Sequence, residues 1–273
     1  MKRGIWILLL ALTLTACGAQ PSREPAAAPA EAPVQEEPAK EPEREAPEKP
    51  EEAAPAEPEP EEAAPEAPAP AAPELPEELA NLLTQAGMTA EDIGAGQLIV
   101  VHADGNTAKV SAFEADDTGG WQTAIPAVDG FVGKNGITAE KQEGDRKTPA
   151  GLFPLTTAFG IQPDPGSGLP YRQVTAESYW VDDPASAVYN QWAEGTESQD
   201  WNSAEHLADY PAQYAYGVVV DYNVNPVVPG KGSAIFLHCG SRPTMGCIAL
   251  PQETVVEILK WLCPGCTPKI LIF

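Results

Sequence analysis

The stretch that decides the fold runs Ile235-Phe236-Leu237-His238-Cys239-Gly240-Ser241-Arg242-Pro243-Thr244-Met245-Gly246-Cys247-Ile248-Ala249-Leu250. Its start belongs to an apolar run over residues 233–238 that ends in a histidine, and residues 246–250 form a second short apolar run. Such runs are typical of buried β-strands, and the Gly, Ser and Pro residues between them are typical of a loop. The stretch therefore predicts two strands joined by one short connection.

Two reactive residue types stand at the ends of these predicted strands. His238 ends the first strand, and Cys247 follows it by nine residues in the second run. A cysteine at its ordinary pKa of about 8.5 is only a few per cent thiolate at neutral pH, so a neighbouring imidazole is needed to take its proton. The pair indicates a cysteine acyltransferase.

The N-terminal residues predict where this chemistry takes place. Lys2 and Arg3 precede an apolar run over residues 5–14 that is too short to span a bilayer, and Leu14-Thr15-Ala16-Cys17 follows. The pattern resembles a bacterial lipoprotein signal. That resemblance implies a signal peptide over residues 1–16 and a lipid on Cys17, which anchors an exported protein to the outer face of the cell membrane or in the periplasm. The alternative is an ordinary secretory signal with an incidental cysteine.

The next segment has the composition of a spacer. From residue 18 to 75 the chain is almost entirely Pro, Glu and Ala, with four basic residues against sixteen glutamates. This composition cannot build a core, and frequent proline together with like charges favours an extended chain. We therefore predict a lipid anchor and a disordered tether over residues 17–75.

The charge balance argues against polyanionic partners. The chain has a net charge of -24, and the region after the tether holds ten basic and twenty-four acidic residues. Phosphate backbones are repelled by such a surface, so we expect no nucleic-acid partner. Because no polybasic cluster flanks Cys17, attachment to the membrane is expected through the lipid alone.

Residues 76–273 are numerous enough for one well-buried domain. Apolar residues at helical spacing predict a short helical lead-in over 76–96, with a helix at 76–87, and a second helix at 252–262 that covers the sheet. Short apolar, β-branched or aromatic runs predict strands at 97–103, 109–113, 217–222, 233–238, 246–250 and 269–273. The predicted fold class is mainly β with a few peripheral helices.

Two motifs carry a resemblance to a known family. The first is Gly144-Asp145-Arg146-Lys147-Thr148-Pro149-Ala150-Gly151-Leu152-Phe153-Pro154-Leu155, and the second ends in Thr244-Met245-Gly246-Cys247. Together, over residues 97–273, they resemble the YkuD-type L,D-transpeptidases of bacterial cell walls. The resemblance implies an L,D-transpeptidase-like β-sandwich as the catalytic domain, acting as a monomer without a cofactor or metal ion.

The resemblance also implies a reaction in cell-wall biogenesis and the maintenance of cell shape. Cys247 would attack a peptidoglycan stem tetrapeptide at its third residue, release the terminal D-alanine and leave a thioester. Resolution by an amine of a neighbouring stem gives a 3-3 cross-link, whereas resolution by water makes the enzyme an L,D-carboxypeptidase. A non-catalytic peptidoglycan-binding lipoprotein is the alternative from another class of function.

Further roles follow from the same resemblance. It makes Cys247 the nucleophile and His238 the base, and the backbone carbonyl of Cys239 orients the imidazole. The backbone N–H groups of Met245, Gly246 and Cys247 are the expected oxyanion donors.

The second motif departs from the family pattern at three points. Met245 stands where the family usually has histidine, Ala249 where an arginine often follows, and the spacing from His238 to Cys247 is short. We expect Arg242 to supply the missing cation for a stem carboxylate, because a guanidinium binds carboxylates through two parallel hydrogen bonds. Thr244 is assigned to substrate binding beside it.

A long segment over residues 162–216 separates the two motif regions and is expected to fold as a substructure. Its rings either form a wall for the substrate or belong to the core; they are Trp180, Tyr189, Trp192 and Trp201. Asp182 and Asp183 are interpreted as part of a turn, without a catalytic role.

The remaining cysteines leave several alternatives open. Cys263 and Cys266 form either a local disulfide or free thiols, and Cys239 is either unpaired or oxidised with Cys247. A zinc site built from these four cysteines and His238 is the competing chemistry. Because the sequence holds one CxxC pair only, no metal is predicted.

Overall fold

The computed structural model describes residues 74–273, all of which belong to one compact unit of the chain. The predictions for the signal peptide, for Cys17 and for the tether up to residue 73 lie outside the described residues. Between residues 74 and 273, no helix is both long enough and apolar enough to cross a membrane.

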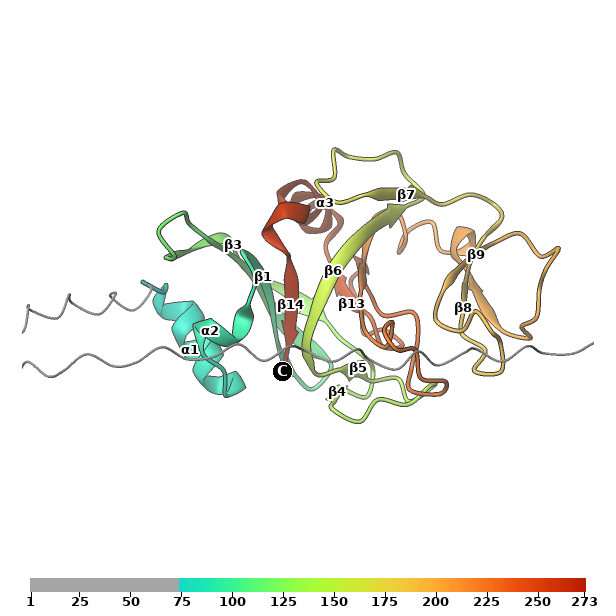
Figure 1. The fold of residues 1–273 in the computed structure, drawn as a ribbon, viewed down its shortest axis with the longest axis horizontal. Helices are drawn as coiled ribbons and strands as arrows, with labels where there is room; N and C mark the ends of the chain where they lie inside the picture. The colour runs from blue at the N-terminus through green and yellow to red at the C-terminus, as the bar shows by residue number, and fades with distance from the viewer. Residues whose placement is uncertain (1–73) are drawn as a thin grey trace, which may run out of the picture. The chain divides into compact units, whose positions relative to one another are not determined.

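The described residues are mainly strands, as predicted (Figure 1). The helices are α1 (Glu77–Ala86), α2 (Ala90–Ile93) and α3 (Gln252–Trp261), with 3-10 turns η1 (Leu207–Asp209) and η2 (Pro264–Cys266). The strands are β1 (Gln97–Asp104), β2 (Thr107–Ala115), β3 (Trp121–Phe131), β4 (Ile137–Thr138), β5 (Thr148–Pro149), β6 (Gly151–Gly160), β7 (Tyr171–Gln173), β8 (Ser178–Val181), β9 (Trp192–Glu194), β10 (Ala204–His206), β11 (Gly217–Val220), β12 (Phe236–Cys239), β13 (Ile248–Leu250) and β14 (Lys269–Ile272).

One large sheet organises the fold. Its strand order is β11-β12-β13-β3-β2-β1-β14-β6-β7, and β11 also pairs with β6. The extra pairing closes the sheet on itself, so that the strands from β11 round to β6 enclose a shared core. Neighbouring strands are mostly antiparallel, but β12 runs parallel to β13, with His238 opposite Ala249. His238 lies in β12, and Cys247 directly precedes β13.

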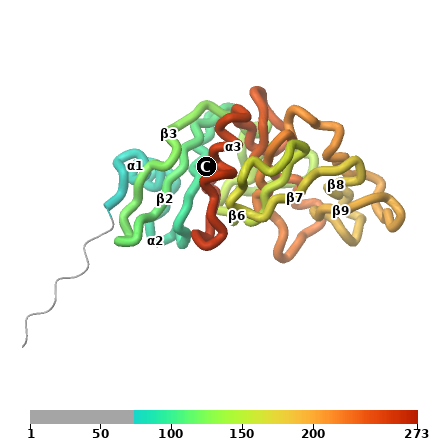
Figure 2. The backbone as a smooth tube through the Cα atoms, turned by 90° about the horizontal axis from the view of Figure 1, so that it is seen from above, coloured from blue at the N-terminus to red at the C-terminus, as the bar shows by residue number. Residues whose placement is uncertain are grey.

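Strand β12 is buried on both of its faces, and its successive side chains point to opposite faces of the sheet. In β12, Leu237 and Cys239 enter the central core, whereas Phe236 packs in a second cluster that includes Cys247. Helix α3 contributes to the central core and contacts β11 and β12, as the sequence predicted. A third cluster lies under α1 and α2. Figures 1 and 2 show these two helices at one end of the unit and β8 and β9 at the other.

The two strands that flank the reactive residues are shorter than predicted. Strand β12 begins at Phe236 because Ala234 has a φ of 52°, a left-handed conformation that interrupts an extended chain. Strand β13 begins at Ile248 because Gly246, with a φ of 154°, still belongs to the preceding loop. Both interruptions lie beside Cys247. They release the backbone groups around the thiol from the sheet.

Two of the longest strands, β3 and β6, escaped the prediction. Strand β3 contains Pro126 and Gly130 and exposes many of its side chains, while β6 contains Pro154 and two threonines. Neither has the continuous apolar run or the strict alternation that indicates a strand. The short helix α2 lies within the predicted helical lead-in over 76–96, although only the helix at 76–87 was given bounds.

The segment over residues 162–216 folds as a substructure, as expected. Strands β8, β9 and β10 form a separate sheet in the order β10-β8-β9, and β7 joins the segment to β6 of the main sheet. The substructure packs on the second cluster through Trp180, Leu207 and Tyr214. It thereby covers the sheet face on which Cys247 lies.

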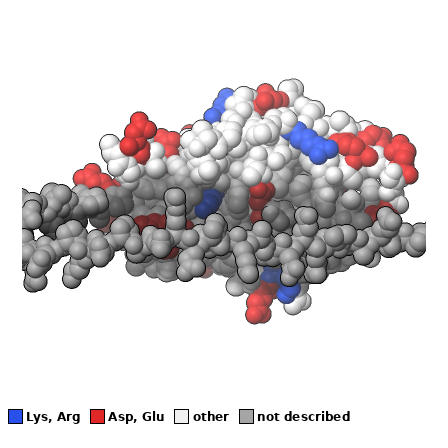
Figure 3. All heavy atoms as spheres, in the orientation of Figure 1, with Lys and Arg blue, Asp and Glu red and all other residues white. Residues whose placement is uncertain are grey.

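Acidic side chains are prominent on the surface. Figure 3 shows Asp and Glu side chains at both ends of the visible face, with isolated Lys and Arg side chains between them. On this face the cations do not gather into a basic patch.

Candidate active site

The parallel pairing of β12 and β13 brings His238 and Cys247 to one face of the sheet. Leu237 lies opposite Ile248, which places Cys247 beside Phe236, and His238 follows two residues further along β12. The backbone N–H of Phe236 lies 3.4 Å from Sγ of Cys247. His238 and Cys247 are 6% and 8% exposed and line the same pocket. The structure thus brings the two predicted residues together.

The imidazole of His238 is held as a neutral base. Its Nδ1 lies 2.8 Å from the backbone carbonyl of Cys239, and because a carbonyl only accepts, Nδ1 carries the hydrogen and Nε2 keeps its lone pair. Burial lowers the pKa of His238 below its ordinary 6.5. The ring of Tyr214 packs edge-on against it, with ring centroids 5.5 Å apart.

The thiol of Cys247 is held as a neutral acid. It donates to the carbonyl of Ala234, with 3.1 Å between Sγ and O. Burial, and secondarily the charge of Glu205, raises the pKa of Cys247 to about 12. Among the described residues, no hydrogen bond joins Cys247 to His238. The resting pair is therefore an uncharged thiol and an uncharged imidazole.

The loop before Cys247 lines the pocket. Thr244 organises this loop: its hydroxyl donates to the Cys247 carbonyl at 2.7 Å and accepts the Gly246 N–H at 3.1 Å. The Gly246 N–H is thus already bonded, and so is the predicted substrate contact Thr244. The N–H groups of Met245 and Cys247 make no hydrogen bond within residues 74–273. Of the three predicted oxyanion donors, these two therefore have no partner among the described residues.

The first sequence motif, residues 144–155, packs against the loop of the second motif before Cys247. Thr148, which is fully buried, accepts the Gly133 N–H at 2.8 Å, and its Oγ1 lies 3.3 Å from the Cys247 carbonyl. A Cβ on Gly246 would lie 3.2 Å from the Lys147 carbonyl, so only a residue without a side chain fits there without displacement. The two motifs, far apart in sequence, meet at the cysteine loop.

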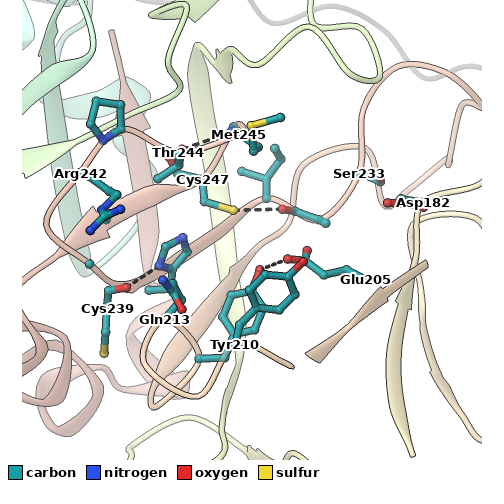
Figure 4. A pocket seen from close by; sticks show the side chains of 18 of the residues that line it. Asp182, Glu205, Tyr210, Gln213, Ser233, Cys239, Arg242, Thr244, Met245 and Cys247 are labelled. Atoms are coloured by element: carbon teal, nitrogen blue, oxygen red, sulfur yellow. Dashed lines mark hydrogen bonds between the residues drawn. The ribbon is translucent and has the colours of Figure 1, made fainter. Parts of the chain in front are cut away.

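A pocket of about 660 Å³ surrounds the thiol. Figure 4 shows Arg242 on one side of Cys247 and Glu205 with Asp182 on the other. Arg242 is exposed and makes no salt bridge within the described part of the chain. Met245 is 57% exposed at the same loop.

Residues to which the sequence analysis assigned no role in the site complete the pocket. Asp182, Glu205, Tyr210 and Tyr214 all come from the 162–216 segment and line the pocket beside Cys247. Tyr214 is buried and its hydroxyl donates to Glu205 at 2.6 Å. No motif or periodicity marks these positions, since they reach the thiol only through the folding of the inserted sheet.

The aromatic rings that the sequence analysis considered as a wall for the substrate do not line the pocket. Trp180, Tyr189 and Trp201 are buried and Trp192 packs against the second cluster, so the core interpretation of these rings holds. The segment does form a wall of the pocket, but through other side chains. Asp183 is a turn residue whose Oδ1 accepts from the Ala185 N–H, and Asp182, which the sequence analysis interpreted as part of the same turn, also lines the pocket.

The sulfurs of the other cysteines lie away from the Cys247 thiol. The sulfur of Cys239 enters the central core and points away from Cys247 in Figure 4. Burial raises the pKa of Cys239 to about 11. Cys263 and Cys266 are free thiols beyond α3. Within residues 74–273, no three His, Cys, Asp or Glu side chains are grouped so as to hold a metal ion.

Comparison with known proteins agrees with the geometry. A family model described as YkuD, the L,D-transpeptidase catalytic domain, matches residues 101–272, which is more than half of the chain. Neither the curated proteins nor the solved structures include a match to the chain. The matched span contains every pocket residue described above.

Proposed function

The chain belongs to the YkuD family of L,D-transpeptidase catalytic domains, and from that premise we propose that it acts on peptidoglycan stem tetrapeptides through a thioester on Cys247. The observation that carries the proposal is the pocket in which a buried thiol and a neutral imidazole lie on one sheet face. A carbonyl fixes the tautomer of that imidazole so that Nε2 is free to accept a proton. These are the requirements of an activated cysteine nucleophile.

The acylation step uses the groups in their resting states. The Cys247 thiol leaves the Ala234 carbonyl and gives its proton to Nε2 of His238, while Sγ attacks the carbonyl carbon of the third stem residue. A C–S bond forms. The C–N bond to the terminal D-alanine then breaks, and the imidazolium returns the proton to the leaving amine. Because burial lowers the pKa of His238, the imidazolium gives up this proton readily in the second half of the step.

The open backbone N–H groups stabilise the charge that develops in this step. An oxyanion beside the cysteine loop meets the N–H groups of Met245 and Cys247, and each such donor lowers a barrier by about 3 kcal/mol. The Gly246 N–H joins them only if Thr244 releases it. Thr244 thus acts on the shape of the loop, and Arg242 is the side chain that we assign to a stem carboxylate.

We further propose that this domain works at the cell surface. Residues 1–16 would be removed as a signal peptide, Cys17 would carry the lipid, and residues 17–75 would space the domain from the membrane. The support is the sequence pattern alone. Changing Cys17 to serine tests it: the protein should move from the membrane fraction to the soluble fraction, and retention in the membrane fraction would refute the anchor.

The reaction is tested with tetrapeptide muropeptides and the purified protein. Mass spectrometry of the products should show 3-3 cross-linked dimers together with free D-alanine. The matched variants are Cys247→Ala, which should form neither product, and Cys263→Ser, which removes a thiol outside the pocket and should form both. Trimmed stems without dimers would make the protein an L,D-carboxypeptidase. No product that depends on Cys247 would favour a peptidoglycan-binding role.

A further inference from the structure

The pocket contains carboxylates that acylation by Cys247 does not use. Glu205 and Asp182 line it on the side away from Arg242. Within residues 74–273 neither makes a salt bridge. The nearby cation Lys141 is already bound to Asp145, with 2.7 Å between Nζ and Oδ1. Two carboxylates therefore share one wall of the pocket without a cation among the described residues.

The environment of this pair is unfavourable without a ligand. One oxygen of Asp182, Oδ1, is shielded from solvent and has no hydrogen-bond partner in the described part of the chain. Burial and the charge of Asp182 raise the pKa of Glu205. Carboxylates removed from water are normally paired with cations or donors, so a pair that has no cation, and in which Asp182 Oδ1 also has no donor, indicates that the partner arrives with a ligand.

Glu205 is nevertheless held in place beside the reactive pair. Glu205 lies in strand β10, which pairs with strand β8. Asp182 directly follows the end of β8. The Tyr214 hydroxyl donates to Oε1 of Glu205 at 2.6 Å, and the same ring packs against His238. The second oxygen, Oε2, has no hydrogen bond within residues 74–273 and is free to accept one. Tyr214 thus contacts both the carboxylate of Glu205 and the ring of His238.

We propose that Glu205 and Asp182 form the binding site for the amine that resolves the Cys247 thioester, and that Glu205 takes a proton from it. The inference rests on the proposed function. A primary amine is an ammonium ion at neutral pH, because its pKa is close to the 10.4 or so of lysine. It therefore enters as a cation and must lose a proton before it attacks, and a carboxylate serves both needs.

The step balances as follows. The ammonium gives one proton to Glu205, and the amine nitrogen attacks the thioester carbonyl carbon. A C–N bond forms as the C–S bond breaks, and the electron pair of that bond passes to sulfur. The nitrogen loses a second proton through His238 to the departing thiolate, which restores the neutral thiol. The proton on Glu205 returns to water. In this arrangement Arg242 binds a carboxylate of the stem peptide that is attached to Cys247. Glu205 and Asp182 bind the ammonium group of the acceptor on the other side of the pocket.

The test is the partition of one thioester between an amine and water. The protein is acylated with tetrapeptide and offered a primary amine, and amide and hydrolysed products are measured by mass spectrometry. For Glu205→Gln the ratio of amide to hydrolysed product should fall about tenfold or more, the size of one lost charge-assisted hydrogen bond. Asp182→Asn should lower the ratio in the same direction, and Glu205→Asp should restore part of it.

Two controls separate this role from a structural one. Hydroxylamine is an uncharged nucleophile at neutral pH, so its partition should not change in Glu205→Gln. The matched variant Glu143→Gln alters another carboxylate of the pocket, one whose oxygen already accepts from the hydroxyls of Tyr189 and Ser233. Its amine partition should also stay the same.

The outcomes distinguish this inference from the proposed function. A Cys247 thioester whose amine partition is unchanged in both Glu205→Gln and Asp182→Asn would overturn the inference alone. An equal loss with hydroxylamine would overturn it as well, because it would show a structural effect. No thioester in the unmodified protein would overturn the proposed function and the inference together.

Discussion

Replacing Thr148 with valine tests how the first motif supports the nucleophile. The hydroxyl of Thr148 accepts the Gly133 N–H at 2.8 Å and lies 3.3 Å from the Cys247 carbonyl, in a position without solvent exposure. Valine keeps the branched shape and removes both interactions. The Gly133 N–H then has no partner, and the Cys247 carbonyl keeps only the hydroxyl of Thr244.

The magnitude follows from these two interactions. A buried donor left without a partner costs about 1–3 kcal/mol, and a long hydrogen bond to a carbonyl that keeps another donor adds little. We therefore expect the free energy of unfolding to fall by about 2 kcal/mol, which for a domain of this size lowers Tm by about 4–8 °C. The rate of thioester formation should fall too, because the loop that positions Cys247 loses its support.

The assay is thermal unfolding of the unmodified protein, of Thr148→Val and of the matched control Thr107→Val. Thr107 also donates from its hydroxyl, to the Asp104 carbonyl at 2.9 Å, but it is exposed, so water replaces that bond. The control should therefore lie within about 2 °C of the unmodified protein. Equal Tm values for Thr148→Val and Thr107→Val would refute the reasoning.

Three other predictions follow from the site. Changing Gly246 to alanine forces a Cβ to within 3.2 Å of the Lys147 carbonyl at a φ of 154°, so acylation should slow while the fold persists by circular dichroism; an unchanged rate would contradict the close packing of the loop. Because burial lowers the pKa of His238, the neutral base persists as the solution becomes more acidic, and the acid limb of kcat/KM should have its midpoint below 6.5; a midpoint above that value would contradict it. Iodoacetamide near neutral pH should modify Cys263 before Cys247, because a hydrogen bond from Cys266 lowers the pKa of Cys263 whereas burial raises the pKa of Cys247 to about 12. Peptide mapping that found Cys247 modified first would show that its thiolate is already formed at rest.

The sequence was sufficient for those parts of the fold and site that depend on local patterns. Helix α3 and strand β1 were predicted because apolar residues recur at helical spacing in one and form a continuous run in the other. The proximity of His238 and Cys247 follows from two short strands joined by one loop. Local patterns also explain the missed strands, since β3 and β6 owe their conformation to pairing with neighbours rather than to their own residues.

The other wall of the pocket could not be predicted, because it depends on contacts between distant segments. Glu205 is an ordinary acidic residue in an irregular stretch, and Asp182 resembles its neighbour Asp183 in sequence. The inserted sheet places Asp182 and Glu205 in the pocket, whereas Asp183 accepts from backbone N–H groups of a turn. Likewise, the left-handed conformation of Ala234, which offers its carbonyl to the thiol, has no signal in the residue type.

The central claim, that Cys247 forms a thioester with a stem tetrapeptide, is tested most directly by intact-mass spectrometry. The protein is mixed with tetrapeptide and the reaction is quenched with acid. The mass of the intact protein is then measured, and the modified residue is located by peptide mapping. We predict an adduct equal in mass to the tetrapeptide less its terminal D-alanine, located on Cys247, present in Cys263→Ser and missing from Cys247→Ala. An adduct that persists in Cys247→Ala, or an unmodified protein that releases D-alanine without any adduct on Cys247, would contradict the account.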